Sequence, residues 1–320
     1  MGTPVNIIRE SFYIIFTLLI IKVSKLSQQY TSSSKVIIGY AVTPVHVGAG
    51  RSPGVVDLPL ARDPVGFPVI YGSSIKGVLK GELIRRNEID EAVCLFGYEP
   101  GEEKSKEQGE VKSFAGMLNL TDFIPLFYPI ASLNKGYVYV TSRYLASRVE
   151  DLISYSLGKE FEFKITQVDG SEKVDILRNK LNSLKRVQVK ETGIPFNELG
   201  NLFKDRAEDS VYLIEDDSIG LQFIESSLVR ITRNKLNRET KTVDKGALWT
   251  EEYYPAGTVF AGAITNTGRK TLEKCKGIQD PFQGLLNKFG SSEKGGFYVF
   301  VGGKETVGKG LMFMKIFQMR

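Results

Sequence analysis

Two glycine-rich stretches carry lysines and offer groups that hold a phosphate. In the later one, Gly302–Gly310, residues Gly303–Lys309 match the G-x-x-x-x-G-K pattern of a nucleotide-binding P-loop. Gly310 follows in place of the Ser or Thr whose hydroxyl would bind Mg²⁺, which argues against an NTPase. Closely spaced backbone N–H groups, with Lys304 and Lys309, still suit a phosphate. The alternative is a turn between two strands, and glycines permit both roles at once.

The earlier stretch, Gly72–Lys80, begins a predicted helix that continues through Leu83, because its apolar residues recur at helical spacing. Ser73, Ser74 and Lys76 stand at or near its first turn. A helix N-terminus attracts anions through its unpaired N–H groups and its dipole. The alternative is ordinary capping of the helix by a serine.

A third basic region spans residues 226–246. Its six basic residues stand against two acidic ones, Glu239 and Asp244, and the basic residues are Arg230, Arg233, Lys235, Arg238, Lys241 and Lys245. Alternating threonine and arginine predict an exposed β-hairpin. The hairpin binds a polyanion or is simply a solvated charged face.

Candidate acid–base and metal-ligating residues are few. Asp57 lies in the glycine- and proline-rich segment 44–68, and its alternative role is that of a turn residue bonding local N–H groups. His46, the only histidine, is an auxiliary base or RNA contact, or else stabilises a turn. Glu252, beside Glu251 and Tyr253, either assists at the site or is solvated. A single histidine excludes a histidine-rich metal centre.

Composition indicates a soluble globular protein, with 42% hydrophobic and 25% charged residues. The net charge of +5 is a weak indication of a polyanionic partner. Cys94 and Cys275 lack metal-ligand spacing, so we expect no disulfide and a cytoplasmic location. The apolar run at 12–21 is shorter than the roughly 20 residues that span a bilayer, so we expect an N-terminal extension (1–34) and no membrane.

Strand and helix patterns intermix, which indicates the α+β class. No fixed-period repeat is visible, and residues 97–112 read as a polar surface insertion. Strands are predicted at 35–42, 116–120, 136–141, 161–168, 211–214, 220–224, 258–265, 296–301 and 311–317. Helices are predicted at 73–83, 142–156, 173–185 and 271–289, the last broken near Pro281.

Several motifs in order resemble the RAMP superfamily of CRISPR proteins, and in particular the repeating backbone subunit of the type III-B (Cmr) complex. They are Thr43–Gly50, Gly54–Pro59, Gly66–Lys80, Arg233–Thr242, Leu248–Pro255 and the terminal glycine loop. The resemblance covers about residues 35–320. It implies an RRM-like (ferredoxin-like) core with insertions at about 97–112 and 142–210, and a thumb hairpin at about 226–250.

The resemblance also implies partners and chemistry. Copies of the chain would stack head to tail along a guide CRISPR RNA, with other Cmr subunits, and cleave paired single-stranded target RNA. Asp57 would position a divalent metal, Mg²⁺ or Mn²⁺, or assist deprotonation of the attacking 2′-OH. The residues expected to contact RNA are Ser73, Ser74, Lys76, Lys80, Arg230, Arg233, Lys235, Arg238, Gly303, Lys304 and Lys309.

Two other functions within the superfamily stay open at this point. A guide-processing endonuclease often relies on histidine and would cut a precursor guide without a target. A non-catalytic structural subunit of the same assembly would bind RNA and lack the cleavage aspartate. The position of Asp57 favours target cleavage over both.

Overall fold

A computed structural model describes residues 34–98, 113–168, 175–176, 179–180, 184–194, 196–205, 210–268, 275–290 and 296–317. The predicted N-terminal extension lies outside the described residues except for Ser34, as do most of the insertion at 97–112 and parts of the insertion at 142–210. Among the helices in the described ranges, none is long and apolar enough to cross a membrane.

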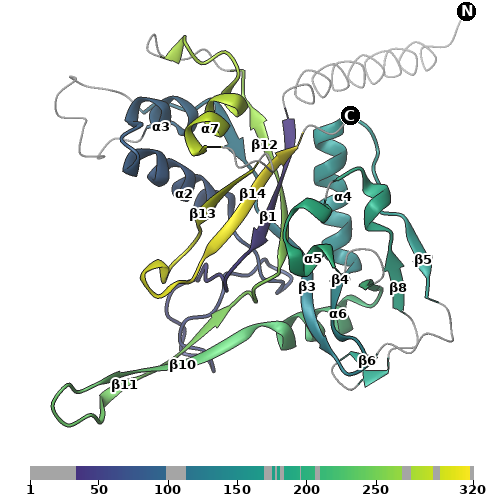
Figure 1. The fold of residues 1–320 in the computed structure, drawn as a ribbon, viewed down its shortest axis with the longest axis vertical. Helices are drawn as coiled ribbons and strands as arrows, with labels where there is room; N and C mark the ends of the chain where they lie inside the picture. Colours follow the sequence, from purple (N-terminus) through teal and green to yellow (C-terminus); the bar gives the residue numbers. More distant parts are fainter. Residues whose placement is uncertain are drawn as a thin grey trace, which may run out of the picture.

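Most of the described strands join in one large mixed sheet (Figure 1). Its main path runs β13-β14-β1-β12-β3-β4-β9-β8-β5, and β2 and β6 pair with strands of this path while β7 pairs with β6. The bounds along the path are β13 (Gly296–Phe300), β14 (Leu311–Phe317), β1 (Ser34–Ala41), β12 (Val259–Asn266), β3 (Ile124–Ser132), β4 (Gly136–Ser142), β9 (Val211–Ile214), β8 (Leu184–Val187) and β5 (Ile165–Gln167). The others are β2 (Leu118–Leu120), β6 (Asp175–Ile176) and β7 (Asn179–Lys180).

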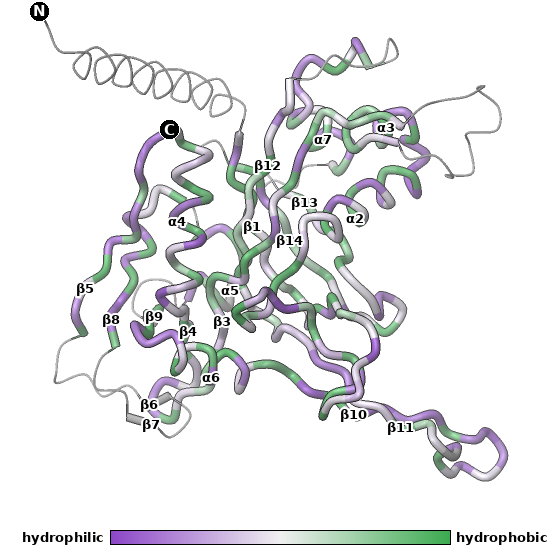
Figure 2. Tube along the Cα trace, turned by 180° about the vertical axis from the view of Figure 1, so that it is seen from behind, coloured by the Kyte–Doolittle hydropathy of each residue, from purple (hydrophilic) through white to green (hydrophobic). Residues whose placement is uncertain are grey.

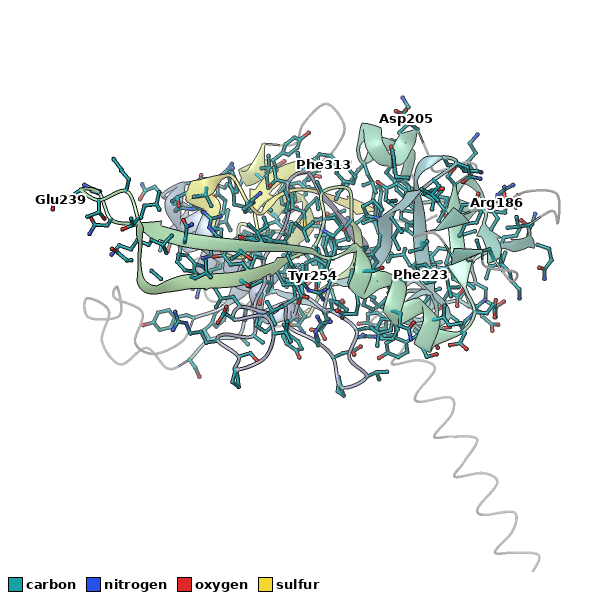
Figure 3. The ribbon with its side chains drawn as sticks, turned by 90° about the horizontal axis from the view of Figure 1, so that it is seen from below. Arg186, Asp205, Phe223, Glu239, Tyr254 and Phe313 are labelled. Carbon is teal, nitrogen blue, oxygen red and sulfur yellow. A yellow bond between two sulfur atoms is a disulfide. The ribbon has the colours of Figure 1, made fainter. Side chains whose placement is uncertain are left out.

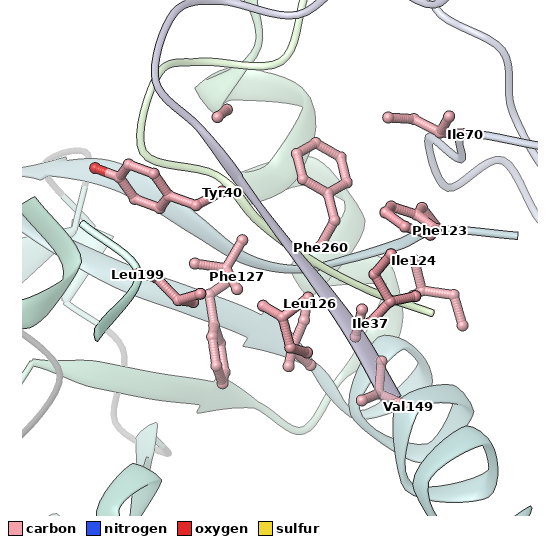
Figure 4. Close-up of a cluster of buried hydrophobic side chains, with 14 of the residues drawn as sticks. Ile37, Tyr40, Ile70, Phe123, Ile124, Leu126, Phe127, Val149, Leu199 and Phe260 are labelled. Carbon is pink, nitrogen blue, oxygen red and sulfur yellow. The ribbon is translucent and has the colours of Figure 1, made fainter. Parts of the chain in front are cut away.

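β1 is buried along nearly its whole length because helices cover it (Figure 1). Helix α4 (Arg143–Leu157) packs on β1, β3 and β12, and its Val149 meets the aromatic and aliphatic side chains of these strands (Figure 4). On the other side lie α2 (Gly72–Arg85), α3 (Ile89–Phe96) and α7 (Pro281–Phe289). The strands at 35–42, 136–141, 211–214, 258–265, 296–301 and 311–317 and the helix at 142–156 are thereby confirmed.

Two predicted elements in the middle of the chain are wrong. The predicted helix at 173–185 contains the short strands β6 and β7 and the start of β8. The predicted strand at 220–224 lies in α6 (Asp217–Ser227), because the Asp216 side chain accepts the N–H groups of Ser218 and Ile219 and caps a helix there. The remaining helical segments here are η2 (Val189–Thr192), η3 (Phe196–Glu198) and α5 (Asn201–Lys204).

The basic region forms the expected hairpin. Strands β10 (Val229–Leu236) and β11 (Val243–Tyr253) form a separate two-stranded sheet within the described part of the chain, and β11 makes one further bridge there, to Leu58. The hairpin projects from the body of the molecule, and its outer part is largely hydrophilic (Figures 1 and 2). Glu239 lies at its tip, far from Arg186 at the other end of the molecule (Figure 3).

The two cysteines form a disulfide, so the prediction that they would not is wrong. Cys94 in α3 and Cys275, which precedes α7, are joined by a disulfide and are 1% and 0% exposed. The sequence separation of 181 residues concealed their proximity, because spacing reveals only local metal or redox motifs. The bond covalently links α3 to the segment that precedes α7, on the α2 side of the sheet. Likewise α7 begins at Pro281, so the described part of the helix predicted before it, residues 275–280, is not α-helical.

Loss of this disulfide should lower the stability of the fold. Closing a long loop restricts the unfolded chain, and removal of such a bond costs about 2–5 kcal/mol. We expect a Cys94→Ala/Cys275→Ala protein to melt at a lower temperature than the wild type in calorimetry. Reductant should lower the melting temperature of the wild type and leave that of the double variant unchanged. Equal melting of the wild type with and without reductant would contradict the bond.

Candidate functional site

The segment 44–68 runs along the root of the hairpin. The Leu58 N–H donates to the Thr250 carbonyl (3.0 Å), and the Glu252 N–H donates to the Leu58 carbonyl (3.1 Å). Asp57 Oδ2 accepts the Thr250 N–H at 2.8 Å. These bonds attach the loop to β11 at residues 250–252 and place the Asp57 carboxylate at the point where the hairpin leaves the body.

Asp57 keeps part of its carboxylate available. The side chain is half-buried, and among the described residues its only side-chain hydrogen bond is the one at Oδ2. Its carbonyl accepts the Ser52 N–H at 2.9 Å, which closes the tight turn that contains the exposed Val55. Oδ1 can therefore bind a ligand while Oδ2 fixes the orientation of the side chain.

His46 is oriented by the same segment of β11. Its Nδ1 lies 2.7 Å from the Glu252 carbonyl, and since a carbonyl only accepts, Nδ1 carries the proton and Nε2 is the basic nitrogen. The ring is 8% exposed and lies 5.4 Å from the Tyr253 ring. A Cβ on Gly48 would lie 2.7 Å from Nε2, so glycine at this position leaves room beside the basic nitrogen.

Glu251 is a fully buried carboxylate that several donors surround. Its Oε1 accepts the Trp249 indole N–H and the Lys304 ammonium, both at 2.6 Å. Its Oε2 accepts the Tyr253 hydroxyl and lies 3.8 Å from Arg233 Nε. Burial, and then the bond to Glu251, raise the pKa of Tyr253 to about 12, so the phenol stays protonated and donates.

Glu252 points to the other face of β11, as neighbouring strand residues must. Its carboxylate is 1% exposed, and it accepts from Arg62 Nη2 (2.9 Å), from Arg230 Nε and Nη2 (3.1 and 2.9 Å) and from the Leu60 N–H (3.2 Å). Glu225 bridges the same two arginines. Because its oxygens are engaged by this network, Glu252 stabilises the hairpin root and has no free oxygen for proton transfer.

The basic residues expected to contact RNA fall into two groups. Arg230, Arg233 and Lys304 have their charged groups within ion-pairing distance of the buried glutamates. In the other group, Lys235 is 74% exposed beside Asp244, Arg238 and Gly303 are exposed, and Lys309 is half-buried with its Nζ 5.7 Å from the centre of the Tyr253 ring.

The start of α2 was predicted to be either a phosphate site or a serine-capped helix end, and its hydrogen bonds match neither arrangement. Tyr71 is the N-cap and makes no side-chain cap bond, so a serine cap is wrong. The Gly72 N–H is already bonded to Asp122 Oδ1 at 2.8 Å, which places a carboxylate where a phosphate was expected. Ser73 is exposed, whereas Ser74, Lys76 and Lys80 are half-buried along the helix.

The carboxylates at the root offer little to a metal ion. The described residues contain no cluster of three Asp, Glu, His or Cys side chains that could hold one. Glu251 and Glu252 are engaged by cations, so Asp57 alone has an oxygen to offer. This set fits only an ion such as Mg²⁺ that keeps several waters and takes further oxygens from phosphate.

Three residues at the root escaped the sequence interpretation. Arg51 is exposed in the same turn as Asp57, directly before Ser52, whose N–H bonds the Asp57 carbonyl. Arg62 connects the loop to the hairpin through Glu252, and Trp249 donates to Glu251. The pairing of the loop with β11 brings them together, and only the basic charge of Arg51 within the turn was a local signal.

Comparisons with known proteins agree over nearly the whole chain. Residues 40–313 match the family model described as the RAMP superfamily. The chain is 32% identical over 292 residues to the CRISPR system Cmr endoribonuclease Cmr4 of Pyrococcus furiosus, covering 87% of this chain and 92% of that protein. It is 26% identical over 311 residues to the CRISPR system CMR subunit Cmr4 of Saccharolobus solfataricus, covering 86% and 94%.

Solved structures give the same result. A chain of the type III-B Cmr-beta complex bound to cognate target RNA superposes with a TM-score of 0.63 at 25% identity, over 88% of this chain and 96% of that one. Oligomeric Cmr4 from Pyrococcus furiosus gives a TM-score of 0.59 at 22% identity, over 89% and 97%, and this likeness shows the fold alone.

Acidification should weaken the hairpin root through Glu251. Burial alone would raise the pKa of Glu251, but the bonds from Lys304, Tyr253 and Trp249 outweigh burial and lower it to about 2. The ionised carboxylate therefore stabilises the fold fully above the ordinary pKa, and this contribution, about 3 kcal/mol, is lost as pH falls toward 2. Urea unfolding followed from about pH 6 to about pH 3 should show a shallower pH dependence for Glu251→Gln. Equal slopes would contradict this.

Proposed function

Because the chain belongs to the RAMP superfamily, we propose that it is the repeating backbone subunit of a type III-B RNA-guided effector and cleaves the target RNA. Its relatives over nearly the full chain are named Cmr4, and one of them an endoribonuclease. The observation that carries cleavage is the hydrogen bond of Asp57 to Thr250, which holds a partly free carboxylate at the hairpin root. Its partners are guide RNA, target RNA, other copies of the chain and other Cmr subunits.

The core of the subunit is ferredoxin-like. In that fold a β-α-β-β-α-β chain forms an antiparallel sheet in which the first strand lies between the last and the third. Here β1 lies between β14 and β12, and β12 is followed by β3, all antiparallel. Helix α2 connects β1 to β3, and α7 connects β12 to the last strands. The order β14-β1-β12-β3 supports this core, with β13 added at its edge and the other strands as insertions.

The hairpin β10–β11 is the thumb that inserts into the guide–target duplex. Its projection from the body (Figures 1 and 2) and the basic residues of its sequence support this role. Leu236 and Leu248 are exposed apolar side chains on the two strands and can wedge between bases, as apolar residues do in kinked nucleic acids. Arg238 and Lys235 supply phosphate affinity, while base pairing with the guide supplies sequence selectivity.

Cleavage takes place where the thumb displaces a nucleotide of the target. The 2′-OH of that nucleotide attacks the adjacent phosphorus, the bond to the 5′-oxygen breaks, and a 2′,3′-cyclic phosphate and a 5′-hydroxyl result. Asp57 Oδ1 holds the 2′-OH and assists its deprotonation, with His46 Nε2 as an auxiliary base. The exposed Arg51 guanidinium lies on the same turn and can stabilise the charge on the phosphorane.

A divalent ion is part of this proposal. In place of binding the 2′-OH directly, Asp57 Oδ1 would hold Mg²⁺ or Mn²⁺ together with water and phosphate oxygens, and the ion would polarise the phosphate. Glu252 has no catalytic part, because its oxygens bind Arg62, Arg230 and a backbone N–H.

The rival functions differ in the RNA that is cut and in whether Asp57 is needed for cutting. A guide-processing nuclease would cut precursor guide RNA alone, whereas this chain requires paired target. A non-catalytic subunit would bind both RNAs and leave the target intact.

Removal of the Asp57 charge should abolish cutting and spare binding. We expect reconstituted effectors with Asp57→Asn to bind guide and target as the wild type does and to cut about 10²-fold more slowly or worse. The amide oxygen of the asparagine can still accept the Thr250 N–H, so this variant removes the charge and keeps the position of the loop. Gel analysis of the target should show regularly spaced products for the wild type, lost on addition of EDTA.

A matched control comes from the other end of the molecule. Asp205, exposed and far from the hairpin tip (Figure 3), should tolerate replacement by asparagine without loss of cutting. An Asp57→Asn effector that cuts at the wild-type rate would refute the assignment of Asp57.

A further inference from the structure

We propose that Lys304 is a positioning residue for cleavage, which fixes the hairpin to the terminal glycine loop through its ion pair with the buried Glu251 carboxylate, and is not a contact to the RNA backbone. The inference rests on the proposed function, because guide RNA is the polyanion that Lys304 would otherwise bind. It replaces the role that the near-P-loop sequence indicates for this lysine.

The environment of the ammonium favours this role. Lys304 Nζ lies 2.6 Å from Oε1 of Glu251, and the Glu251 side chain is 0% exposed. A buried carboxylate that loses its cation bears a large desolvation penalty, so transfer of the ammonium to a solvated phosphate is unfavourable. The other cation, Arg233, has its Nε 3.8 Å from Oε2, beyond hydrogen-bond distance, so Lys304 makes the shorter contact with the carboxylate.

The backbone of the loop supports the same conclusion. Four positions between residues 302 and 310 have positive φ, and three of them are glycines: Gly302, Gly308 and Gly310. The fourth is Lys304, at φ +69°, a conformation that is unfavourable for a residue with a side chain. Glycine would adopt this backbone conformation more easily than lysine. The presence of lysine therefore indicates that its side chain is needed at this position.

The loop that bears Lys304 is itself attached to the body. The Gly303 N–H donates to the His46 carbonyl at 2.9 Å, and Glu305 pairs with Arg85 of α2 at 3.1 Å. The short helix η5 (Glu305–Val307) begins at the second of these anchors. Through Lys304 and Glu251, β11 is thereby connected to both His46 and α2. A change in the pair would alter the direction of the hairpin relative to Asp57.

Lys309 provides the contrast. Its Nζ lies over the Tyr253 ring, and no ion pair of its side chain is recorded within the described residues. Lys309 therefore has the properties of a phosphate contact that Lys304 lacks. The two lysines of one loop, five positions apart in sequence, are assigned different roles.

A double-mutant cycle in the full chain tests this assignment. The variants are Lys304→Met, Glu251→Gln, the two combined, and Lys309→Met as the phosphate-contact control. Lys304→Met removes the nearest cation from a buried carboxylate, whereas the combined variant removes both charges, so we expect the combination to recover most of the lost cutting and thermal stability. If Glu251→Gln restores the cutting and the stability that Lys304→Met loses, Lys304 acts through Glu251. A lysine that contacts only phosphate could not give this result.

Two readouts do not require cutting. Trp249 is the only tryptophan, and its N–H shares Glu251 Oε1 with Lys304, so its emission should shift in Lys304→Met. Guide RNA affinity measured against salt should keep its slope in Lys304→Met, whereas Lys309→Met should lower the slope by about 0.7–0.9. These results hold even for a subunit that does not cleave, so failure here and failure of the proposed function are distinguishable.

The outcomes are decisive in either direction. If Lys304→Met does not fold and the combined variant does, the ion pair is the structural element proposed, and the proposal stands. If Lys304→Met lowers the salt slope like Lys309→Met, leaves the emission unchanged, and gains nothing from Glu251→Gln, Lys304 contacts RNA and the proposal is overturned.

Discussion

Two adjacent buried carboxylates, Glu251 and Glu252, determine how the working parts of this molecule fit together. Neighbouring residues of a strand point to opposite faces, so one of the two carboxylates lies on each face of β11. A buried charge is tolerated only with close partners, and here the partners come from distant segments. Lys304, from the terminal glycine loop, lies on one face of β11, and Arg62, from the segment 44–68, lies on the other face. Both loops are therefore attached to the hairpin at its root.

This arrangement explains why the candidate cleavage groups gather at one place without a cluster of acidic ligands. Asp57 accepts a backbone N–H of Thr250, and His46 donates to the backbone carbonyl of Glu252. The backbone of β11 thus aligns the acid–base groups, while the side chains of the same strand residues align the hairpin. The proposed function requires the hairpin and the Asp57 carboxylate to keep a fixed position relative to each other, and both are attached to the same segment of β11.

The sequence predicted the parts of the structure that local patterns control. The strands β1, β4, β9, β12, β13 and β14 and the helix α4 follow from local residue patterns, and the basic hairpin followed from residue type together with the family resemblance. It failed where distant contacts decide. Residues 220–224 are apolar enough for a strand, but the Asp216 cap begins a helix there. Cys94 and Cys275 meet only through packing, and the ion pair of Lys304 was not visible in the sequence because its buried partner lies 53 residues away.

The most direct test of the central claim is a structure of the reconstituted effector bound to guide and to a target with 2′-deoxy nucleotides at the cleavage positions. The account predicts that, beside each inserted hairpin, Asp57 Oδ1 lies within about 3 Å of the position of the missing 2′-OH, or one water away. An inserted hairpin with Asp57 more than about 10 Å from the displaced linkage, beyond the reach of a single bridging water, would contradict it.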